Sequence, residues 1–425
     1  MANEFLKTHD LTFAHRTHNQ AIEHITYDAA TPLGPYGPMW IFVKKLSISE
    51  LLGSHTHHKF LSIRTRELHS FLHVIFEKSR AGEMVSITRE ALRFANNIIS
   101  QMMLGYKSIE DSNSELLNLI REVTEIFGEF DPSDFLPFLK NVGFQVTKKK
   151  AHDIRRRYDR FLEKFITKRE NERKKIDAND AIQRNFLDLL LDLAEDENSE
   201  VQLTRNHIKG LLMDYLTAGT DSIAVAIEWV IKELLNNPGV LQKAREEIHN
   251  VVGKTRLVEE ADTPNLRYMQ ALIKETLRLH PPIPVILRGS VEECKVREYT
   301  LPKNTLLIVN VWSIGRDPKT WEDPLSFRPE RFLHSEDGDL SIDIKGQHFQ
   351  LLPFGAGRRV CSGTALAMLL LPVTVAALIQ CFDWRLDGEQ GKNINDMTEK
   401  PGITAPPAQE LVCFPTTLFH PPNLT

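Results

Sequence analysis

"LLPFGAGRRVCSG", residues 351–363, places a lone cysteine in a glycine-rich, doubly basic loop just before a long apolar stretch. Its three glycines allow tight turns and a close approach of the backbone to a flat ligand. Arg358 and Arg359 can lower the pKa of the Cys361 thiol or bind an anion, and the positive end of a helix starting near Gly363 also favours the thiolate. A thiolate can bind a metal ion or act as a nucleophile. A nucleophilic cysteine would need a histidine base, which only the fold could bring near. The loop therefore favours a metal thiolate over a buried structural cysteine.

Composition describes an ordinary globular protein. The chain has 425 residues, of which 42% are hydrophobic and 26% charged. A net charge of −5 predicts no nucleic-acid partner. The four cysteines are too few and too scattered for a disulfide framework, so a reducing compartment is expected: Cys294, Cys361, Cys381 and Cys413.

Two segments bear on membrane contact. The N-terminal "MANEFLKTHDLTFAHR" has no apolar run typical of a signal peptide or anchor, so the chain as written is predicted to be soluble or peripheral. The apolar stretch 365–382 contains Pro372, Thr374 and Gln380, and we predict a buried core helix rather than a membrane span. The basic segment 148–175 keeps apolar residues at helical spacing; a solvated amphipathic helix is favoured over contact with a membrane surface.

The pattern along the chain predicts one mainly α-helical domain over 1–425 with a minor β-sheet. Residues 40–282 are rich in helix-spaced apolar positions, and 283–312 holds short β-branched runs around a turn at Pro302–Asn304. The cysteine loop occupies 352–363, and a C-terminal helix and β turn follow over 364–425. The histidines of "SHTHH" (54–58) lack a carboxylate or cysteine companion, so exposure is favoured over metal binding.

The spacing Phe354-x-x-Gly357-x-Arg359-x-Cys361-x-Gly363 resembles the haem-binding loop of the cytochrome P-450 superfamily. Four further segments resemble that family's motifs: "WIFVK" (40–44), "AGTDS" (218–222), "KETLRLHPP" with Glu275 and Arg278, and "FRPERF" with Arg331. The resemblance implies the cytochrome P-450 fold, with haem b bound through the Cys361 thiolate. A thiolate ligand pushes electron density to the iron and favours O–O cleavage.

The resemblance also implies roles for single residues, each with a plainer alternative. Trp40, Lys44, Arg288 and Arg359 would clamp the haem propionates, whereas Trp40 alone could be a core aromatic. Lysine at 44 keeps the charge of the more usual arginine but loses its bidentate fork. Glu275, Arg278 and Arg331 would form a buried network, although Glu-x-x-Arg alone could be a surface helix pair.

Residues 218–222 would lie beside the bound oxygen. Ala218 and Gly219 are small enough for a ligand to lie close to the helix, or for another helix to pack there. Asp221 and Ser222 put a carboxylate and a hydroxyl into an apolar helix, which is costly unless they are hydrogen-bonded or used. In the family such a pair brings protons to oxygen. Serine replaces the usual threonine, so looser coupling of oxygen reduction to product is expected.

Long segments, among them "DTPNLRYMQALIKETLRLHPPIPVILR", more closely resemble plant flavone synthase II. That resemblance implies conversion of flavanones to flavones by C2–C3 desaturation or 2-hydroxylation. O2 and electrons from NADPH, passed on by NADPH-cytochrome P-450 reductase, would drive the reaction at the cytosolic face of the endoplasmic reticulum. Isoflavone synthases and triterpene oxidases are similar too. The candidate pocket residues are mostly apolar and do not select one substrate: Met213, Leu216, Thr217, Val285, Ile286, Ile403 and Thr404.

The chain departs from the family pattern at its start, where a membrane anchor, a proline-rich hinge, the first strands and a helix are expected. Missing strands would expose an edge of a small sheet. A truncated, catalytically silent relative that still binds a protein or ligand is therefore a second hypothesis. A helical scaffold without a cofactor is a third, and it would have to treat five ordered motifs as coincidence.

Overall fold

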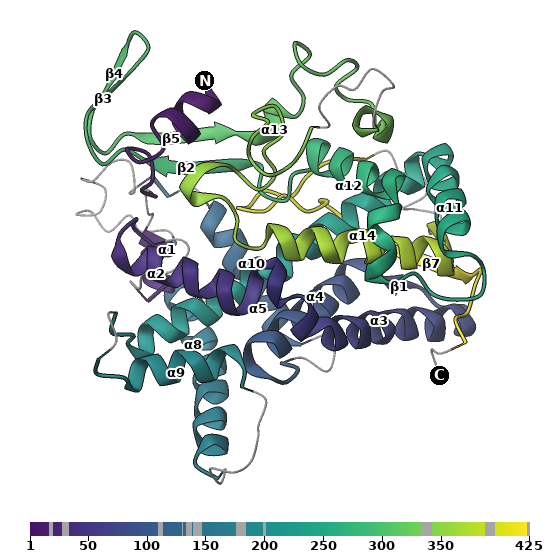
Figure 1. The fold of residues 1–425 in the computed structure, drawn as a ribbon, viewed down its shortest axis with the longest axis horizontal. Coiled ribbons are helices and arrows are strands. Elements are labelled where there is room, and N and C mark those ends of the chain that lie inside the picture. Colours follow the sequence, from purple (N-terminus) through teal and green to yellow (C-terminus); the bar gives the residue numbers. More distant parts are fainter. Residues whose placement is uncertain are drawn as a thin grey trace.

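The computed structural model describes residues 1–16, 20–27, 34–108, 114–129, 131–132, 138, 147–175, 184–198, 201–333, 342–386 and 396–422. Helices dominate, and small antiparallel sheets lie at two sides of the helical body, as predicted (Figure 1). The helices are α1 (Gln20–Ile25), α2 (Pro38–Ser47), α3 (Leu61–Ala81), α4 (Ile87–Leu104), α5 (Glu115–Gly128), α8 (Lys148–Arg173), α9 (Phe186–Glu195), α10 (Arg205–Asn236), α11 (Pro238–Val252), α12 (Arg267–Leu279), α13 (Val311–Ile314) and α14 (Thr364–Cys381). Short π-helical segments are η1 (Glu4–Thr8) and η2 (Ile48–Leu52), and short 3₁₀-helical segments are η3 (Ser54–Thr56), η4 (His58–Phe60), η5 (Glu260–Asn265), η6 (Pro329–Phe332) and η7 (Gly357–Arg359).

The strands pair as antiparallel neighbours. β2 (Val285–Gly289) pairs with β5 (Leu306–Asn310), and β3 (Cys294–Val296) pairs with β4 (Tyr299–Leu301), which confirms the predicted strands in 283–312. A separate sheet has the order β1-β7-β6, from β1 (Val85–Ser86), β7 (Val412–Thr417) and β6 (Phe382–Leu386). β1 lies inside the region predicted as helical, because its partner Cys413 is more than 300 residues away and no local pattern reveals the pairing.

α10 is the long central helix of the core. Thr204 caps its N-terminus by accepting the His207 backbone N–H, and the Asn237-Pro238 step ends it as predicted. α4 lies alongside it so closely that a Cβ on Gly219 would come within 2.8 Å of the Ile99 side chain. Gly219 therefore serves close helix packing, which was the alternative to making room for a ligand.

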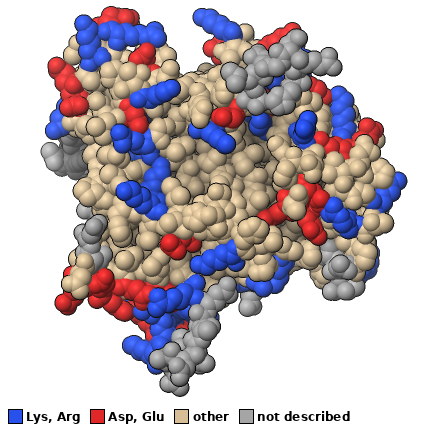
Figure 2. All heavy atoms as spheres, viewed as in Figure 1, with Lys and Arg blue, Asp and Glu red and all other residues tan. Residues whose placement is uncertain are grey.

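The basic segment forms the amphipathic helix α8, with Ile154, Tyr158 and Leu162 buried. Its arginines meet acidic partners: Arg157 pairs with Glu122, Arg169 with Asp188 and Arg173 with Asp192. Where α8 and α9 lie, Figure 2 shows basic and acidic side chains crowded together, while the centre of this face is largely uncharged. The ion pairs support the solvated-helix interpretation.

α14 is the apolar stretch that follows the cysteine loop. Among the described residues it is the one helix long and apolar enough to span a membrane, yet 72% of it is buried inside the protein. It packs against α10, α11 and α12, as the prediction of a core helix requires.

Glu275 and Arg278 of α12 form a fully buried ion pair. The guanidinium donates Nε to Glu275 Oε2 at 2.7 Å and Nη2 to Oε1 at 2.8 Å. Its remaining N–H groups reach the carbonyls of Gly315, Pro324 and Ser326. Glu275 Oε1 also accepts Arg331 Nε at 3.2 Å, so the predicted network forms in place of a surface helix pair.

The cysteine loop packs against η1 through Gly357. This glycine has φ of +70°, and a Cβ there would lie 2.4 Å from the Leu6 carbonyl oxygen and 2.5 Å from Asp10 Oδ1. Asp10 in turn accepts the Arg358 backbone N–H at 3.0 Å. Only glycine tolerates both the backbone angle and the close approach.

Glu275→Gln should lower the free energy of unfolding by about 3–5 kcal/mol, because it leaves the Arg278 charge buried without a carboxylate. Glu77→Gln is the matched control, since Glu77 and Arg80 form an exposed i, i+3 pair at 2.8 Å. It should cost at most about 0.5 kcal/mol. Chemical denaturation followed by circular dichroism measures both, and equal losses would show that the buried network adds nothing.

Gly357→Ala should destabilise the protein more than Gly82→Ala. Gly82 has nearly the same φ, +67°, but open space around its Cβ position, so alanine there costs only the left-handed conformation, about 1–2 kcal/mol. At Gly357 the added methyl must also displace η1. The difference between the two melting temperatures measures that displacement, and no difference would contradict the close contact.

Candidate active site

Cys361 lies at the end of the loop that leads into α14. Its backbone N–H donates to the Phe354 carbonyl at 3.0 Å, and Thr364 Oγ1 donates to the Cys361 carbonyl at 2.9 Å. The residue is accessible to solvent although protein surrounds it deeply, so the thiol faces an opening in the interior rather than the outer surface. Gly363 is half-buried, and a Cβ added to it would lie 3.8 Å from the Cys361 sulfur.

The predicted lowering of the Cys361 pKa is wrong for the chain without a metal. Burial raises the pKa of the thiol and outweighs the Gly363 N–H, the Thr364 hydroxyl, Lys44 and Arg16, which all favour the thiolate. The Arg358 side chain pairs with Asp10 at 3.5 Å. A bound metal ion would reverse this balance, since a coordinating thiol loses its proton.

Positive charge gathers around the loop. Burial, followed by repulsion from Arg16 and Arg359, lowers the pKa of Arg288 to about 9. Burial and Arg16 likewise lower the pKa of Arg359 to about 9. Burial also lowers the pKa of Lys44 to about 8, against the attraction of the Cys361 thiolate. The cluster therefore carries more buried positive charge than its carboxylates neutralise.

Each predicted clamp residue has a definite neighbour. Trp40 is buried on α2, and the Arg359 guanidinium lies over its ring at 4.3 Å from the centroid. Arg359 also donates to the carbonyls of Ala14 and Gly34, both at 2.7 Å. The Lys44 ammonium donates to the Arg358 carbonyl at 2.6 Å and the Val360 carbonyl at 3.0 Å, which ties α2 to the cysteine loop. Its predicted contact with a propionate stays a prediction.

Arg16 is a site residue that sequence reasoning missed. Its buried Nε has no hydrogen-bond partner within the described residues, and burial lowers its pKa against the attraction of Asp214 and Cys361. It belongs to no recognised motif, so only the fold brings it beside the loop. A buried cation with a free donor fits an anionic group.

The donor set fits a haem. Cys361 offers a thiolate for the iron, while Arg16, Arg288 and Arg359 offer buried positive charge for two propionates. Gly355 and Gly357, with φ of +72° and +70°, would let the loop backbone approach the flat face of a haem closely. These residues would hold the group.

α10 presents an accessible strip inside its otherwise buried length. Ala218 is exposed and Ser222, one turn on, is half-buried, between fully buried neighbours such as Leu216 and Ala224. Solvent therefore reaches the middle of the central helix at this point. Ser222 Oγ donates to the Ala218 carbonyl at 2.6 Å, so its hydroxyl is held by its own helix and stays beside the opening.

Asp221 lies on the next flank of α10, away from that strip. It is 2% exposed, and its Oδ2 accepts the Thr404 hydroxyl at 2.6 Å. Burial raises the pKa of this carboxyl, against the Thr404 hydrogen bond and the charge of Arg121. The predicted pair is thus split: the hydroxyl faces the opening and the carboxyl faces the C-terminal turn.

The predicted pocket residues do not all come together. Met213 and Leu216 are completely buried in the main core, and Thr217 bonds Tyr158 of α8 through its hydroxyl at 3.1 Å, so none shares the open strip of Ala218. The reason is the helical period, which turns these positions toward other neighbours. Val285 and Ile286 are half-buried on β2.

The C-terminal turn contains the other two predicted pocket residues, Ile403 and Thr404. Ile403 is half-buried and donates its N–H to the Thr124 carbonyl at 3.1 Å, which fixes the turn on α5. Thr404 is engaged with Asp221.

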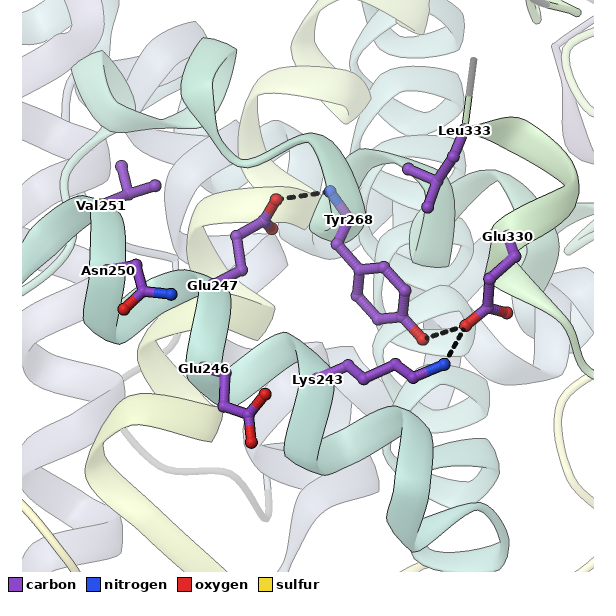
Figure 3. A pocket seen from close by; sticks show the side chains of 8 residues that line it. All are labelled: Lys243, Glu246, Glu247, Asn250, Val251, Tyr268, Glu330 and Leu333. Carbon is purple, nitrogen blue, oxygen red and sulfur yellow. Dashed lines mark hydrogen bonds and ion pairs between the residues drawn. The ribbon is translucent and has the colours of Figure 1, made fainter. Parts of the chain in front are cut away.

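A separate groove of about 420 Å³ lies at the surface between α11, α12 and η6 (Figure 3). Glu330 accepts Lys243 at 2.7 Å and the Tyr268 hydroxyl at 3.1 Å, and Glu247 caps α12 through the Tyr268 N–H. These polar groups satisfy one another, so the groove is structural. In the parts of the chain described, no group of three or more metal-ligating side chains forms, and the 54–58 histidines lie in and around η3 and η4.

The sequence matches the family model described as "Cytochrome P450" over residues 1–414. It is 51% identical to "Cytochrome P450 93B16" of Glycine max, over 99% of this chain and 82% of that protein. It is 51% identical to "Cytochrome P450 93B2" of Gerbera hybrida, over 98% of this chain and 81% of that protein. It is 44% identical to a "2-hydroxyisoflavanone synthase" of Glycine max, over 97% of this chain and 80% of that protein. With a cysteine loop, a cation cluster and a family model that covers nearly all of its length, the chain belongs to the cytochrome P-450 family.

Proposed function

We propose that the protein is a haem-thiolate monooxygenase that converts flavanones to flavones, by C2–C3 desaturation or 2-hydroxylation. The observation that carries the proposal is the cluster of buried cations around the accessible Cys361 thiol. The 44% identity with a relative named 2-hydroxyisoflavanone synthase supports the flavonoid class of substrate.

Haem, when bound, supplies the activation of O2 that side chains alone cannot. The protein's part follows from its geometry. Cys361 would hold the iron of the haem, and the arginines would bind its propionates. The Ser222 hydroxyl holds a proton beside the opening, while Asp221, on the next flank of α10, is a buried carboxyl that accepts the Thr404 hydroxyl. Ala218 leaves room for substrate next to the same strip.

The apolar side chains of Val285, Ile286 and Ile403 suit a flat aromatic substrate without selecting one. The relative named 2-hydroxyisoflavanone synthase makes an isoflavonoid reaction the second candidate. The proposal includes NADPH-cytochrome P-450 reductase as electron donor and the cytosolic face of the endoplasmic reticulum as location, both by family resemblance.

The purified, reduced protein should show a red-shifted Soret band in the carbon monoxide difference spectrum, because that shift requires a thiolate ligand. Cys361→Ala should abolish it and Cys294→Ala, at a cysteine on β3, should not. With a plant reductase and NADPH, naringenin should yield a flavone or its 2-hydroxy precursor. A haem spectrum without flavanone turnover would refute the substrate, and an isoflavonoid product would favour the second candidate.

Ser222→Ala should divert NADPH into hydrogen peroxide, about 10-fold or more per product formed, because the hydroxyl beside the opening is lost. Ser222→Thr keeps the hydroxyl and restrains its χ1, so it should match or exceed the parent. Product, peroxide and NADPH are measured together. An unchanged ratio of product to NADPH in the alanine variant would show that the hydroxyl takes no part in the reaction.

A further inference from the structure

α4 contacts the middle of α10 through two positions on one of its faces. Asn96 and Ile99 are three residues apart, so they are neighbours on the surface of α4. A Cβ on Gly219 would come within 2.8 Å of the Ile99 side chain, and Asn96 Nδ2 donates to the Thr220 hydroxyl at 3.2 Å. The two helices are therefore in close contact at the level of the accessible strip.

The side-chain amide of Asn96 has a partner on each side. Its Oδ1 accepts the Ser108 hydroxyl at 2.5 Å, while its Nδ2 donates to Thr220. Asn96 and Thr220 are both 0% exposed, and Ser108 is half-buried just beyond the end of α4. A hydrogen bond in such surroundings is directional, and it is costly to leave unmade because bulk water cannot reach the orphaned group. These three residues form a chain of hydrogen bonds that joins α4 to α10 inside the core.

Thr220 lies on the opposite side of α10 from the accessible strip. It is two positions after Ala218 and two before Ser222, and at about 100° per residue this places it roughly 160–200° round the helix from both. Ser222 Oγ is bonded to the Ala218 carbonyl of its own helix at 2.6 Å, so the direction of the hydroxyl follows the rotation of the helix. A contact that holds Thr220 therefore also sets where the strip faces.

Apolar packing alone specifies this rotation weakly. α10 is buried on nearly every side around the strip, and a helix that is apolar all round can pack at several rotations of similar energy. One buried polar contact can select among them, as a buried asparagine selects the register of a coiled coil. Other side-chain hydrogen bonds hold α10 at Tyr215, Thr217 and Asp221, but they reach α2, α8 and the C-terminal turn rather than α4.

We propose that Asn96 is a positioning residue: through Thr220 it sets the rotation of the middle turn of α10, and with it the direction in which Ala218 and Ser222 face. Asn96 acts on the reaction only through the helix, since it is completely buried on the far side of the strip. The expected effect on oxygen chemistry rests on the proposed function, whereas the effect on the rotation of α10 does not.

Chemical denaturation of two single variants and their combination tests the hydrogen bond itself. Thr220→Val replaces the hydroxyl by a methyl group and leaves Asn96 Nδ2 without an acceptor, and Asn96→Leu leaves the hydroxyls of Thr220 and Ser108 without a partner. Each should lower the denaturation midpoint. The combined variant removes both buried partners, so its midpoint should lie above those of the two single variants. Strictly additive losses would overturn the proposal.

Alkylation of a thiol introduced by Ala218→Cys reports where the strip faces, without turnover. Mass spectrometry of the labelled peptides separates this thiol from the native cysteines. Once Thr220 is released, burial of the exposed position is favoured, so alkylation should be about 3-fold or more slower in the combined variant. Ala224→Cys, at a fully buried position of α10, gives the rate for a covered thiol.

Asn97→Leu is the matched control for both measurements. Asn97 is completely buried beside Asn96 on the same helix, but its amide makes no hydrogen bond within the parts of the chain described. Its replacement should change neither the alkylation rate at position 218 nor the ratio of product to NADPH consumed. Thr220→Ser keeps the hydroxyl and should restore what Thr220→Val loses.

The haem-loaded enzyme tests the consequence for the reaction. The combined variant should form about 3-fold less product per NADPH consumed, although its stability is recovered and its carbon monoxide difference spectrum is unchanged, because a small misplacement of the strip is enough to weaken catalysis. A role limited to stability would predict that product formation recovers together with the denaturation midpoint.

Alkylation and product formation like those of the parent in the combined variant would overturn the proposal. Slower alkylation with an unchanged product ratio would overturn the role in the reaction. Absence of the haem spectrum in the parent would instead refute the proposed function, and the alkylation rates would still decide what sets the rotation of α10. If Asn96→Leu does not fold, Thr220→Val alone gives the same test, because it exchanges one hydroxyl for a methyl group.

Discussion

Buried positive charge around the cysteine loop is the constraint on which the site depends. Arg16, Arg288, Arg359 and Lys44 come from four separate parts of the chain, and burial lowers the pKa of each. Such charges can remain in the interior only if carbonyls, aromatic faces or an anion compensate them. Backbone carbonyls from residues 14, 34, 358 and 360 supply part of that compensation, so the N-terminal segment and α2 are held to the loop by the same charges that would receive a dianionic cofactor.

α10 positions other side chains of the candidate site, with a different set on each of its flanks. One flank carries Ala218 and Ser222 beside the opening, a second carries Gly219 against Ile99, and a third carries Asp221 and Glu228 toward α5 and the C-terminal turn. A helix buried on nearly all sides can do this because each neighbour fixes one set of side chains. The chemistry thus depends on the angular position of a residue on the helix as much as on its identity.

Motifs with short, fixed spacing were predictable from the sequence, and features that depend on distant packing were not. The strands of 283–312 follow from local patterns, and the Glu275–Arg278–Arg331 network was implied by the resemblance of its motifs to the cytochrome P-450 family; both form. The pKa of Cys361 was predicted in the wrong direction because burial is a property of the whole fold. Arg16 and strand β1 have partners hundreds of residues away. Met213, expected beside the pocket, is completely buried in the main core, and an all-round apolar helix gives no period from which its flank could be predicted.

The Glu275–Arg278 pair also constrains the order in which the chain can mature during synthesis. The carbonyls that satisfy Arg278 lie 37, 46 and 48 residues later in the chain, and the further donors to Glu275 lie 53 and 56 residues later. α12 therefore leaves the ribosome well before the groups that allow its ion pair to be buried. Until residue 331 has emerged, these charges lack their full set of partners, and α12 cannot dock permanently on α10. Packing of the core is therefore completed only after the C-terminal third of the chain has been made, although most of the core helices are synthesised earlier.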